Sequence, residues 1–344
     1  MSNATGREVH LSYWKLVHCN PQNSSPGGCC GFFVGYWSIH WYLKEFRKAM
    51  HNSIVLVKQV PDTTNISGQV MKEDGTVNRS KLPAIFNFED KVALEFALQI
   101  KDMCGGKVTA VTMGPPRASD VLRECLYMGA DDAYLITDRK FAGADTLATS
   151  YVLSEAIKKI GNFDFVFAGR QAIDGDTAQV GPQTAEKLGI PQITYAEEIL
   201  EVKDDCVRVR RKIDGGYEVL ESKLPVLMTV LKDAADPRPF SAKRVMAYKG
   251  AKSLLELEKL AEGNSLLYID KLVFEYKNRS LYIPTLTVED LQIDVARCGI
   301  KGSPTKVYNV DSVVLSGSDP VRIENSRAGM NALIDALLED RILG

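Results

Sequence analysis

The sequence predicts an α/β fold: a parallel sheet with helices on both faces, extended by an antiparallel β segment and a C-terminal arm. First, apolar β-branched runs such as Ser53–Val60 and Lys107–Met113 alternate with helical stretches, which is typical of a parallel sheet. Second, the pattern changes after Glu198 to closely spaced strands with turns at Asp204-Asp205 and Asp214–Gly216. Third, 344 residues with 45% hydrophobic content suit one large domain or two smaller ones.

The first predicted strand, Ser53–Val60, is an apolar run that ends at a proline. A turn at Asp74-Gly75 then predicts a small hairpin over Gln69–Asn78. Asn87 stands where it would cap a helix, because apolar residues recur at helical spacing after it. Cys104–Gly106 is expected to end this helix.

Strands and helices continue to alternate after this helix. In order, we expect a strand at Lys107–Met113, a helix at Val121–Met128, a strand at Ala133–Thr137, a helix at Asp145–Ile160 and a strand at Phe163–Ala168. In such sheets, ligands bind at the carboxyl ends of strands, in the loops that enter helices. The loops in that position are Lys58–Pro61, Met113–Pro116, Phe141–Thr146 and Gly169–Gln179.

The second half of the chain predicts an antiparallel meander and then an arm. The strands of the meander are expected at Leu200–Val202, Cys206–Lys212, Tyr217–Ser222 and Val226–Leu231. After it we expect an exposed loop at Asp233–Arg244, an amphipathic stretch at Leu254–Ala261, and a helix over Val321–Leu343 that is broken near Gly329. We therefore divide the chain into an atypical extension (1–49), an α/β body (50–245) and a C-terminal arm (246–344).

Residues 1–49 differ in composition from the rest. The aromatic run Gly31–Leu43 is shorter than the ~20 residues of a membrane span and lacks the order of a signal peptide. Two interpretations stay open: an interfacial anchor lipidated at Cys29 or Cys30, or a non-native segment upstream of a start at Met50. The first predicted strand begins directly after Met50, which favours the non-native segment. We expect no stable membrane insertion.

Composition excludes several classes of function. The net charge of −2 argues against a nucleic-acid partner. No histidine occurs after position 51, which excludes Ser–His–Asp and Cys–His catalysis and His-ligated metal sites from the chain beyond that position. The body cysteines form no CxxC pair, so we expect reduced thiols and a cytoplasmic protein.

The strongest candidate site is the loop Gly169–Pro182, with the sequence GRQAIDGDTAQVGP, which follows a strand and opens a helix. A helix N-terminus offers unpaired N–H groups and a partial positive charge, both suited to phosphate. Gly169 and Gly175 allow close backbone approach. Asp174 or Asp176 would cap the helix.

Side chains of the same loop add further possibilities. Thr177 and Gln179 can donate to phosphate oxygens. The loop is neither GxGxxG nor a P-loop lysine motif, so spacing alone leaves a phosphate site and an ordinary helix cap equally open. For Lys58, a phosphate or partner contact and a solvated lysine are also both open. The pair Asp145-Thr146 favours a simple N-cap.

With these residues in view, the body resembles the beta subunit of electron transfer flavoproteins, from about Ile54 to at least Thr305. The segments that carry the resemblance are Val57–Asp62, Asn87–Ala97, Asp214–Pro225, Ser303–Thr305 and, above all, the highly specific Gly169–Pro182.

The resemblance implies a nucleotide-binding (Rossmann-like) domain in the body and an arm that helps form a flavin domain shared with an alpha subunit. Carried over residue by residue, the nucleotide contacts would be Leu56, Asn87, Phe88, Glu89, Asp90, Met113, Gly169, Arg170, Gln171, Ala172, Ile173, Asp174, Gly175, Asp176, Thr177, Ala178, Gln179 and Val180. Phe141–Thr146 would approach the flavin ring, and Arg170 is our first candidate to tune its potential.

The family forms a heterodimer whose alpha subunit carries its own FAD. The beta subunit holds AMP in simple electron carriers and a second FAD in the electron-bifurcating branch. This chain resembles the bifurcating branch at Gly175 and in the segment Thr177–Pro182. The implied function passes electrons from NADH to ferredoxin or flavodoxin and, through the alpha-subunit FAD, to an acyl-CoA dehydrogenase. Hydride transfer needs positioning and electrostatics, which fits the missing histidines. NADH oxidation is expected only in the heterodimer.

Two alternatives stay open: a non-bifurcating carrier with AMP that accepts electrons from acyl-CoA dehydrogenases, and a nucleotide-binding regulatory module without a redox role. The chain also departs from the family twice. Phe88 stands where the family often has proline. In Asp236–Met246, which corresponds to the partner-recognition loop, Ala242 stands in place of the central leucine and weakens the prediction of an acyl-CoA dehydrogenase contact.

Overall fold

The computed structural model describes residues 50–62, 83–262, 265–305, 322–339 and 342 of the chain. The expectations for residues 1–49 and for a hairpin at Gln69–Asn78 lie outside this part. Among the described helices, none combines the length and the apolar character needed to cross a bilayer.

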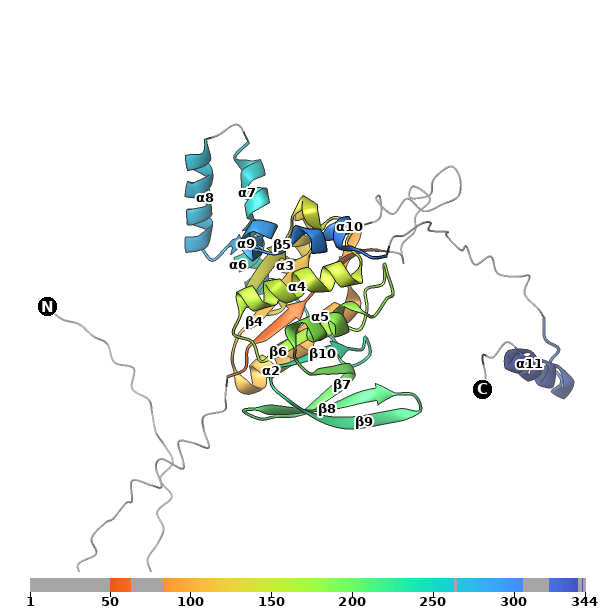
Figure 1. The fold of residues 1–344 in the computed structure, drawn as a ribbon. Coiled ribbons are helices and arrows are strands. Elements are labelled where there is room, and N and C mark those ends of the chain that lie inside the picture. Colours follow the sequence, from red (N-terminus) through yellow and green to blue (C-terminus); the bar gives the residue numbers. More distant parts are fainter. Residues whose placement is uncertain (1–49, 63–82, 263–264, 306–321, 340–341, 343–344) are drawn as a thin grey trace, which may run out of the picture. The chain divides into compact units, whose positions relative to one another are not determined.

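A nine-stranded sheet forms the centre of the structure (Figure 1). In spatial order its strands are β13 (Thr285–Leu286), β5 (Asp132–Ile136), β4 (Val108–Met113), β1 (Ser53–Leu56), β6 (Phe165–Gly169), β10 (Val226–Val230), β7 (Gln192–Val202), β8 (Cys206–Ile213) and β9 (Gly216–Lys223). The strands from β13 to β7 pair in parallel, and β8 and β9 continue the sheet in antiparallel pairing. The predicted α/β class is confirmed.

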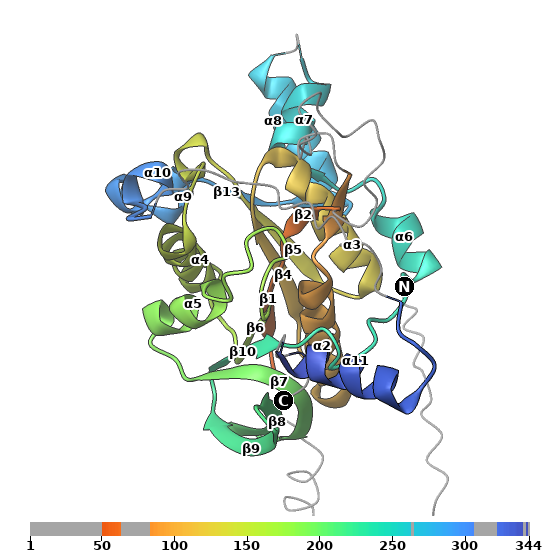
Figure 2. The ribbon, with the colours of Figure 1, turned by 90° about the vertical axis from the view of Figure 1, so that its right-hand side faces the viewer.

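Helices cover both faces of the sheet (Figure 2). One face packs against α2 (Phe88–Cys104) and α3 (Ser119–Met128), and the other against α4 (Thr146–Ile160) and α5 (Val180–Leu188). Within β1, Val55 packs in the core between the sheet and helices α2 and α3. Ile54 and Leu56 pack in the core between the sheet and helices α4 and α5. Successive strand residues point to opposite faces, so a strand covered on both sides is apolar throughout.

The remaining elements are short or peripheral. They are the strands β2 (Gln59–Pro61), β3 (Ala84–Phe86), β11 (Lys252–Ser253) and β12 (Tyr282–Ile283), and the helices α6 (Ala242–Tyr248), α7 (Leu254–Leu260), α8 (Leu266–Asn278), α9 (Val288–Leu291), α10 (Gly299–Gly302) and α11 (Arg327–Glu339). Single 3₁₀ turns lie at Pro116–Ala118, Arg139–Phe141 and Val295–Arg297.

The expected place of Val226–Leu231 in an antiparallel meander is wrong. Instead, β10 lies between β6 and β7 and pairs with both in parallel. All five residues of β10 are buried, as expected for a central strand covered on both faces. The antiparallel part therefore consists of β7, β8 and β9, and β7 begins at Gln192, well before the predicted change of pattern.

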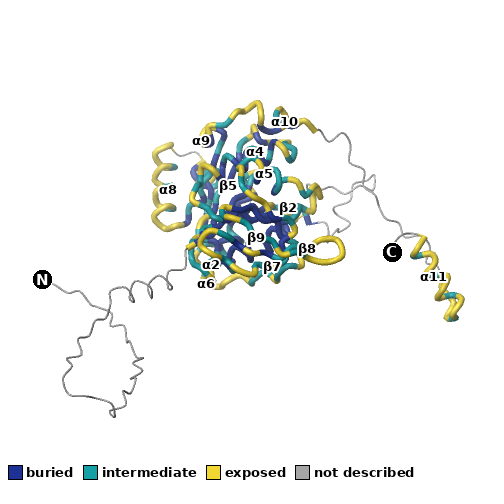
Figure 3. The backbone as a smooth tube through the Cα atoms, turned by 60° about the horizontal axis from the view of Figure 1, so that its bottom comes forward, coloured by how far each residue is buried: buried dark blue, intermediate teal, exposed yellow. Residues whose placement is uncertain are grey.

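Helical structure beyond the sheet also differs from expectation. The predicted loop Asp233–Arg244 ends in α6, and α8 was not predicted. Helix α8 contains no buried residue (Figure 3). The predicted break near Gly329 is wrong, because α11 runs continuously from Arg327 to Glu339.

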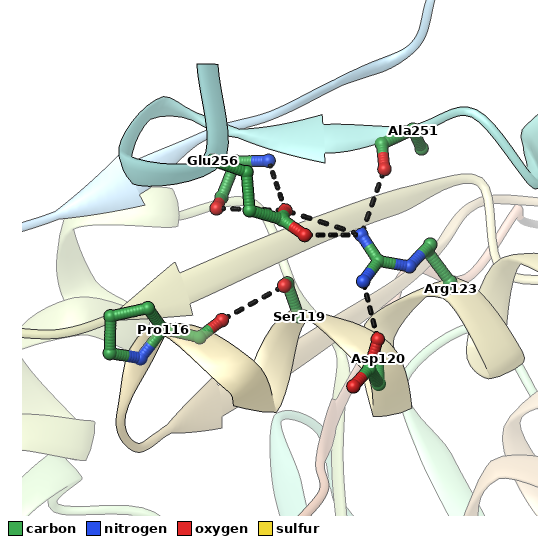
Figure 4. Close-up of polar contacts among 7 residues, drawn as sticks. Pro116, Ser119, Asp120, Arg123, Ala251 and Glu256 are labelled. Atoms are coloured by element: carbon green, nitrogen blue, oxygen red, sulfur yellow. Dashed lines mark hydrogen bonds and ion pairs between the residues drawn. The ribbon is translucent and has the colours of Figure 1, made fainter. Parts of the chain in front are cut away.

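Arg123 on α3 joins the sheet domain to residues beyond 250 (Figure 4). Its Nη1 donates to the carbonyl oxygen of Ala251 at 2.9 Å and to Glu256 Oε1 at 3.1 Å, and its Nη2 donates to Asp120. Burial alone would raise the pKa of Glu256, but hydrogen bonds from Ser253 and the charge of Arg123 outweigh it and lower the pKa. This network fixes the start of α7 against α3.

Arg123→Met is expected to lower the free energy of unfolding by about 1–3 kcal/mol, because it removes charge-assisted hydrogen bonds from a largely covered site. Urea unfolding measures the loss. Lys158→Met is the control, because it breaks an exposed pair with Glu155 on α4 and should cost at most about 0.5 kcal/mol. Equal losses in the two variants would contradict an anchoring role for Arg123.

The same network predicts a pH dependence. The folded-state pKa of Glu256 lies below its ordinary value of 4.5, so its stabilising effect is present above pH 4.5 and is lost as the pH falls through the lower folded value. The stability difference between the natural protein and Glu256→Gln should therefore narrow in acid. A difference that stays constant from neutral pH to pH 3 would contradict this role of the carboxylate.

Candidate functional site

The order of the strands reverses next to β1. The chain proceeds from β1 to β4 and β5 on one side, and then crosses through α4 to β6 on the other side. In open α/β sheets, ligands bind at the carboxyl ends of the strands beside such a reversal. Two of the predicted loops start there. Lys58–Pro61 comes after β1, although its residues Gln59–Pro61 form the short strand β2, and Gly169–Gln179 starts at the end of β6 and leads into α5.

Asp90 connects the ends of these two strands. Its Oδ1 accepts the backbone N–H of Gly169 and its Oδ2 accepts that of Lys58, both at 2.9 Å. Burial raises the pKa of Asp90 to about 7, although hydrogen bonds from Asn87, Gly169 and Lys58 act in the opposite direction. The folded chain therefore holds this proton more tightly than the unfolded chain, and that contribution to the free energy of unfolding is lost as the pH rises through about 7, although the two backbone hydrogen bonds themselves favour the ionised carboxylate.

Glu89 holds the next part of the loop. Its side chain is only 6% exposed, and Oε1 accepts Nη2 of Arg170 at 3.1 Å while Oε2 accepts the backbone N–H of Gln171 at 2.8 Å. The Nε of Arg170 is buried and has no hydrogen-bond acceptor among the described residues. The guanidinium is thus oriented by Glu89 and keeps one donor for another group.

Asn87 stands directly before α2, as predicted, but its side chain does not cap the helix. It donates to the carbonyl oxygen of Gln171 at 3.0 Å and accepts the N–H of Ile173 at 3.4 Å. Glu89 and Asp90 lie in the first turn and already place negative charge at this helix end. The asparagine is therefore available to hold the loop.

The predicted capping role of Asp174 and Asp176 is wrong. Helix α5 starts only at Val180, and its first turn has neither a side-chain cap nor an acidic residue. Asp174 instead pairs with Lys58 Nζ, which lies 2.8 Å from both carboxylate oxygens, and Asp176 accepts Nε2 of Gln171 at 2.8 Å. Lys58 is thus neither a free cation nor an unpaired solvated lysine in this structure.

Helix α4 borders the loop from the other side. Asp145 caps it by accepting the N–H of Ala148 at 3.0 Å, which confirms the simple N-cap interpretation. The next residue, Thr146, donates to Oε1 of Gln179 at 2.9 Å. This link between the starts of α4 and α5 was not predicted, because it joins residues from two different loops.

The two glycines of the loop differ in their surroundings. A Cβ on Gly169 would stand 2.5 Å from Asp90 Oδ1 and 2.8 Å from the backbone nitrogen of Asp90, so close approach requires glycine there. At Gly175, no described protein atom lies within 4 Å of the position that a Cβ would occupy. Any close partner of Gly175 would therefore come from outside the described residues.

The structure brings most of the predicted site residues together. Those joined by hydrogen bonds around the loop are Asn87, Glu89, Asp90, Gly169, Arg170, Gln171, Ile173, Asp174, Asp176 and Gln179. Three others lie at the edge of this group. Leu56 and Met113 pack in the core between the sheet and helices α4 and α5, and Phe88 is 52% exposed. Ala172, Thr177 and Ala178 belong to the exposed or half-buried stretch before α5, and the half-buried Val180 begins that helix.

A cavity of about 200 Å³ beside Arg170 and Glu89 was not predicted from the sequence. Its other walls come from Glu197 on β7, Lys212 on β8 and residues 231–234 after β10. No local signal could have revealed it, because it exists only once β10 lies between β6 and β7.

The site combines a loop whose first residues are held in place with hydrogen-bond donors that lack a side-chain acceptor among the described residues. Residues 169–171 are held by buried carboxylates, whereas the N-terminus of α5 lacks a side-chain cap and Nε of Arg170 lacks an acceptor among the described residues. Backbone N–H groups at a helix start together with a guanidinium suit phosphate oxygens. The site therefore has the chemistry to bind a phosphate-containing ligand.

Comparisons with known proteins point in one direction. The model of the electron transfer flavoprotein domain matches residues 74–254. The electron transfer flavoprotein subunit beta of Clostridium acetobutylicum is 45% identical over 270 residues, covering 78% of this chain and 91% of that protein. The acryloyl-CoA reductase electron transfer subunit gamma of Anaerotignum propionicum is 40% identical, covering 84% and 98%, and the caffeyl-CoA reductase–Etf complex subunit CarD of Acetobacterium woodii is 42% identical, covering 74% and 85%.

Gly169→Ala is expected to destabilise the fold by about 1–3 kcal/mol, because the added methyl group collides with the start of α2. Gly175→Ala is the matched control within the same loop and should change stability by at most about 0.5 kcal/mol. Urea unfolding of both variants measures the contrast. Similar stability of the two variants would mean that the contact between Gly169 and Asp90 does not constrain the loop.

Proposed function

The chain belongs to the electron transfer flavoprotein family, and from that premise we propose that it binds FAD at the Gly169–Val180 loop. In this proposal it passes electrons from NADH to ferredoxin or flavodoxin and, through the FAD of an alpha subunit, to an acyl-CoA dehydrogenase. The observation that carries it is the family-specific loop, held by Glu89 and Asp90 at the strand-order reversal. The chain's own role as an electron-transfer subunit follows from its relatives.

The residues present fit an adenine nucleotide. The buried Nε of Arg170 has no acceptor among the described residues, the start of α5 carries no acidic residue, and the space at Gly175 is open. A pyrophosphate would supply the missing acceptors and the negative charge. Lys58 could exchange Asp174 for a phosphate oxygen, since both groups are partly exposed.

FAD, when bound, supplies hydride acceptance and one-electron transfer. The chain's own residues would position it. Asp90 and Glu89 hold the base of the loop, and Arg170 lines the adjoining cavity. A fixed positive charge near a flavin stabilises its reduced, anionic form, so Arg170 would raise the potential.

Two relatives support the proposed class of partner. One is named as an electron transfer subunit of an acryloyl-CoA reductase, and the other as a subunit of a caffeyl-CoA reductase–Etf complex. By analogy, an oxidoreductase that acts on acyl-CoA esters is our proposed partner. The alternative, a simple carrier with AMP in the beta subunit, uses the same phosphate donors.

Cofactor analysis of the purified heterodimer separates these functions. Two FAD per heterodimer and NADH oxidation are expected. One FAD with one AMP and no NADH oxidation would support the simple carrier and contradict bifurcation. A complex without flavin absorbance would support the non-redox regulatory module.

Arg170→Gln is expected to lower the affinity for FAD about ten- to a hundredfold, which corresponds to one lost charge-assisted contact of about 1.5–3 kcal/mol. Titration of flavin fluorescence measures it. Arg279→Gln, directly after α8, breaks an exposed pair with Glu275 and should leave affinity unchanged. Arg170→Gln alone leaves the buried charge of Glu89 without its partner. The double variant Glu89→Gln/Arg170→Gln removes that charge as well, and full affinity for FAD in the double variant would contradict a direct phosphate contact by Arg170.

A further inference from the structure

Asp90 occupies an unusual position for a carboxylate, between the ends of two neighbouring parallel strands. In the sheet, Leu56 of β1 lies opposite Ala168 of β6. Just beyond this pair, the N–H groups of Lys58 and Gly169 both point to the carboxylate, at 2.9 Å each. One side chain thus determines the separation of the two segments that flank the strand-order reversal.

The contact is closely packed. Asp90 is 7% exposed, and a Cβ at position 169 would stand 2.5 Å from its Oδ1. Each oxygen serves one backbone donor, and an ionised carboxylate accepts at both oxygens without a hydrogen of its own. A neutral carboxyl group has a hydrogen on one oxygen, which weakens that oxygen as an acceptor for the N–H facing it.

We propose that Asp90 is the positioning residue of the nucleotide site, and that protonation of its carboxyl group loosens the loop after β6 and lowers nucleotide affinity. The nucleotide part of this inference rests on the proposed function, and the loop part does not. Protonation requires no partner molecule other than water, and the released N–H becomes available to solvent.

The charged groups around Asp90 come from each element packed against it. From the end of β1, Lys58 favours the ionised carboxylate, but its Nζ is engaged by Asp174. On α2 itself, the neighbouring Glu89 is paired with Arg170. From α3, the Cys125 thiol stays protonated, because burial first, and then the charges of Glu124 and Asp90, raise its pKa well above the usual value. The burial of Asp90 places its own titration near neutral pH, with a pKa of about 7.

Hydrogen exchange in the nucleotide-free chain tests the loop part directly. The protection factors of the Lys58 and Gly169 amides, corrected for the intrinsic pH dependence of exchange, should be about tenfold lower at pH 6 than at pH 8. The ¹³C carboxyl resonance of Asp90 should titrate over the same range. Constant protection of both amides from pH 6 to pH 8 would overturn the inference.

Two isosteric variants on α2 provide the comparison. Asp90→Asn places an amide hydrogen at one of the two donors and should remove the pH dependence of amide protection. Glu95→Gln neutralises another buried carboxylate of the same helix, one that instead binds Arg238, and should keep the profile of the natural protein. An unchanged profile in Asp90→Asn, or a flat one in Glu95→Gln, would overturn the inference. If Asp90→Asn does not fold, exchange and carboxyl titration in the natural protein still decide.

Binding of FAD tests the nucleotide part, because a pyrophosphate does not titrate between pH 6 and 8. Affinity should fall about tenfold from pH 8 to pH 6, the ratio of the ionised fractions for a group that titrates near pH 7. If FAD fails to bind at any pH while the two amides follow the predicted profile, the proposed function fails and the loop role of Asp90 stands. Equal FAD affinity at both pH values would overturn the role of Asp90 in nucleotide binding.

Discussion

Two adjacent carboxylates at the start of α2 hold the site together. Asp90 and Glu89 reach across from α2 to the loop that follows β6 and bind three backbone N–H groups and one guanidinium. Burying such charges is costly unless each oxygen finds donors, and here the donors are supplied by the ends of β1 and β6. The arrangement of the loop therefore depends on the acids of a helix far from it in sequence.

The helix starts at this edge of the sheet use their positive ends in three ways. Helix α4 is capped by Asp145, and α2 carries acids in its first turn. Helix α5 has neither, so its first-turn donors and partial charge have no side-chain partner. Among these three helices, α5 is therefore the one whose start has the chemistry to bind an anion.

The antiparallel extension depends on the position of β10. Because β10 lies between β6 and β7, the strands β7 to β9 extend the sheet beyond the site and supply two walls of the cavity beside Arg170. The charges of this extension are arranged in cross-strand pairs such as Arg211 with Glu218. These pairs stabilise the strands, while Arg170, held by Glu89, lines the cavity together with Lys212 and Lys232.

Local pattern in the sequence was sufficient for the alternating strands and helices, the loops at the carboxyl ends and the family-specific segment Gly169–Pro182, because these depend on residues close together in the chain. Tertiary structure alone decided that β10 is a central strand, that Asn87 binds the loop instead of capping α2, and that Asp174 pairs with Lys58. In each case, a short run or a polar side chain had several possible partners. Which partner was chosen depended on which elements lay within hydrogen-bond reach, and sequence spacing does not encode that proximity.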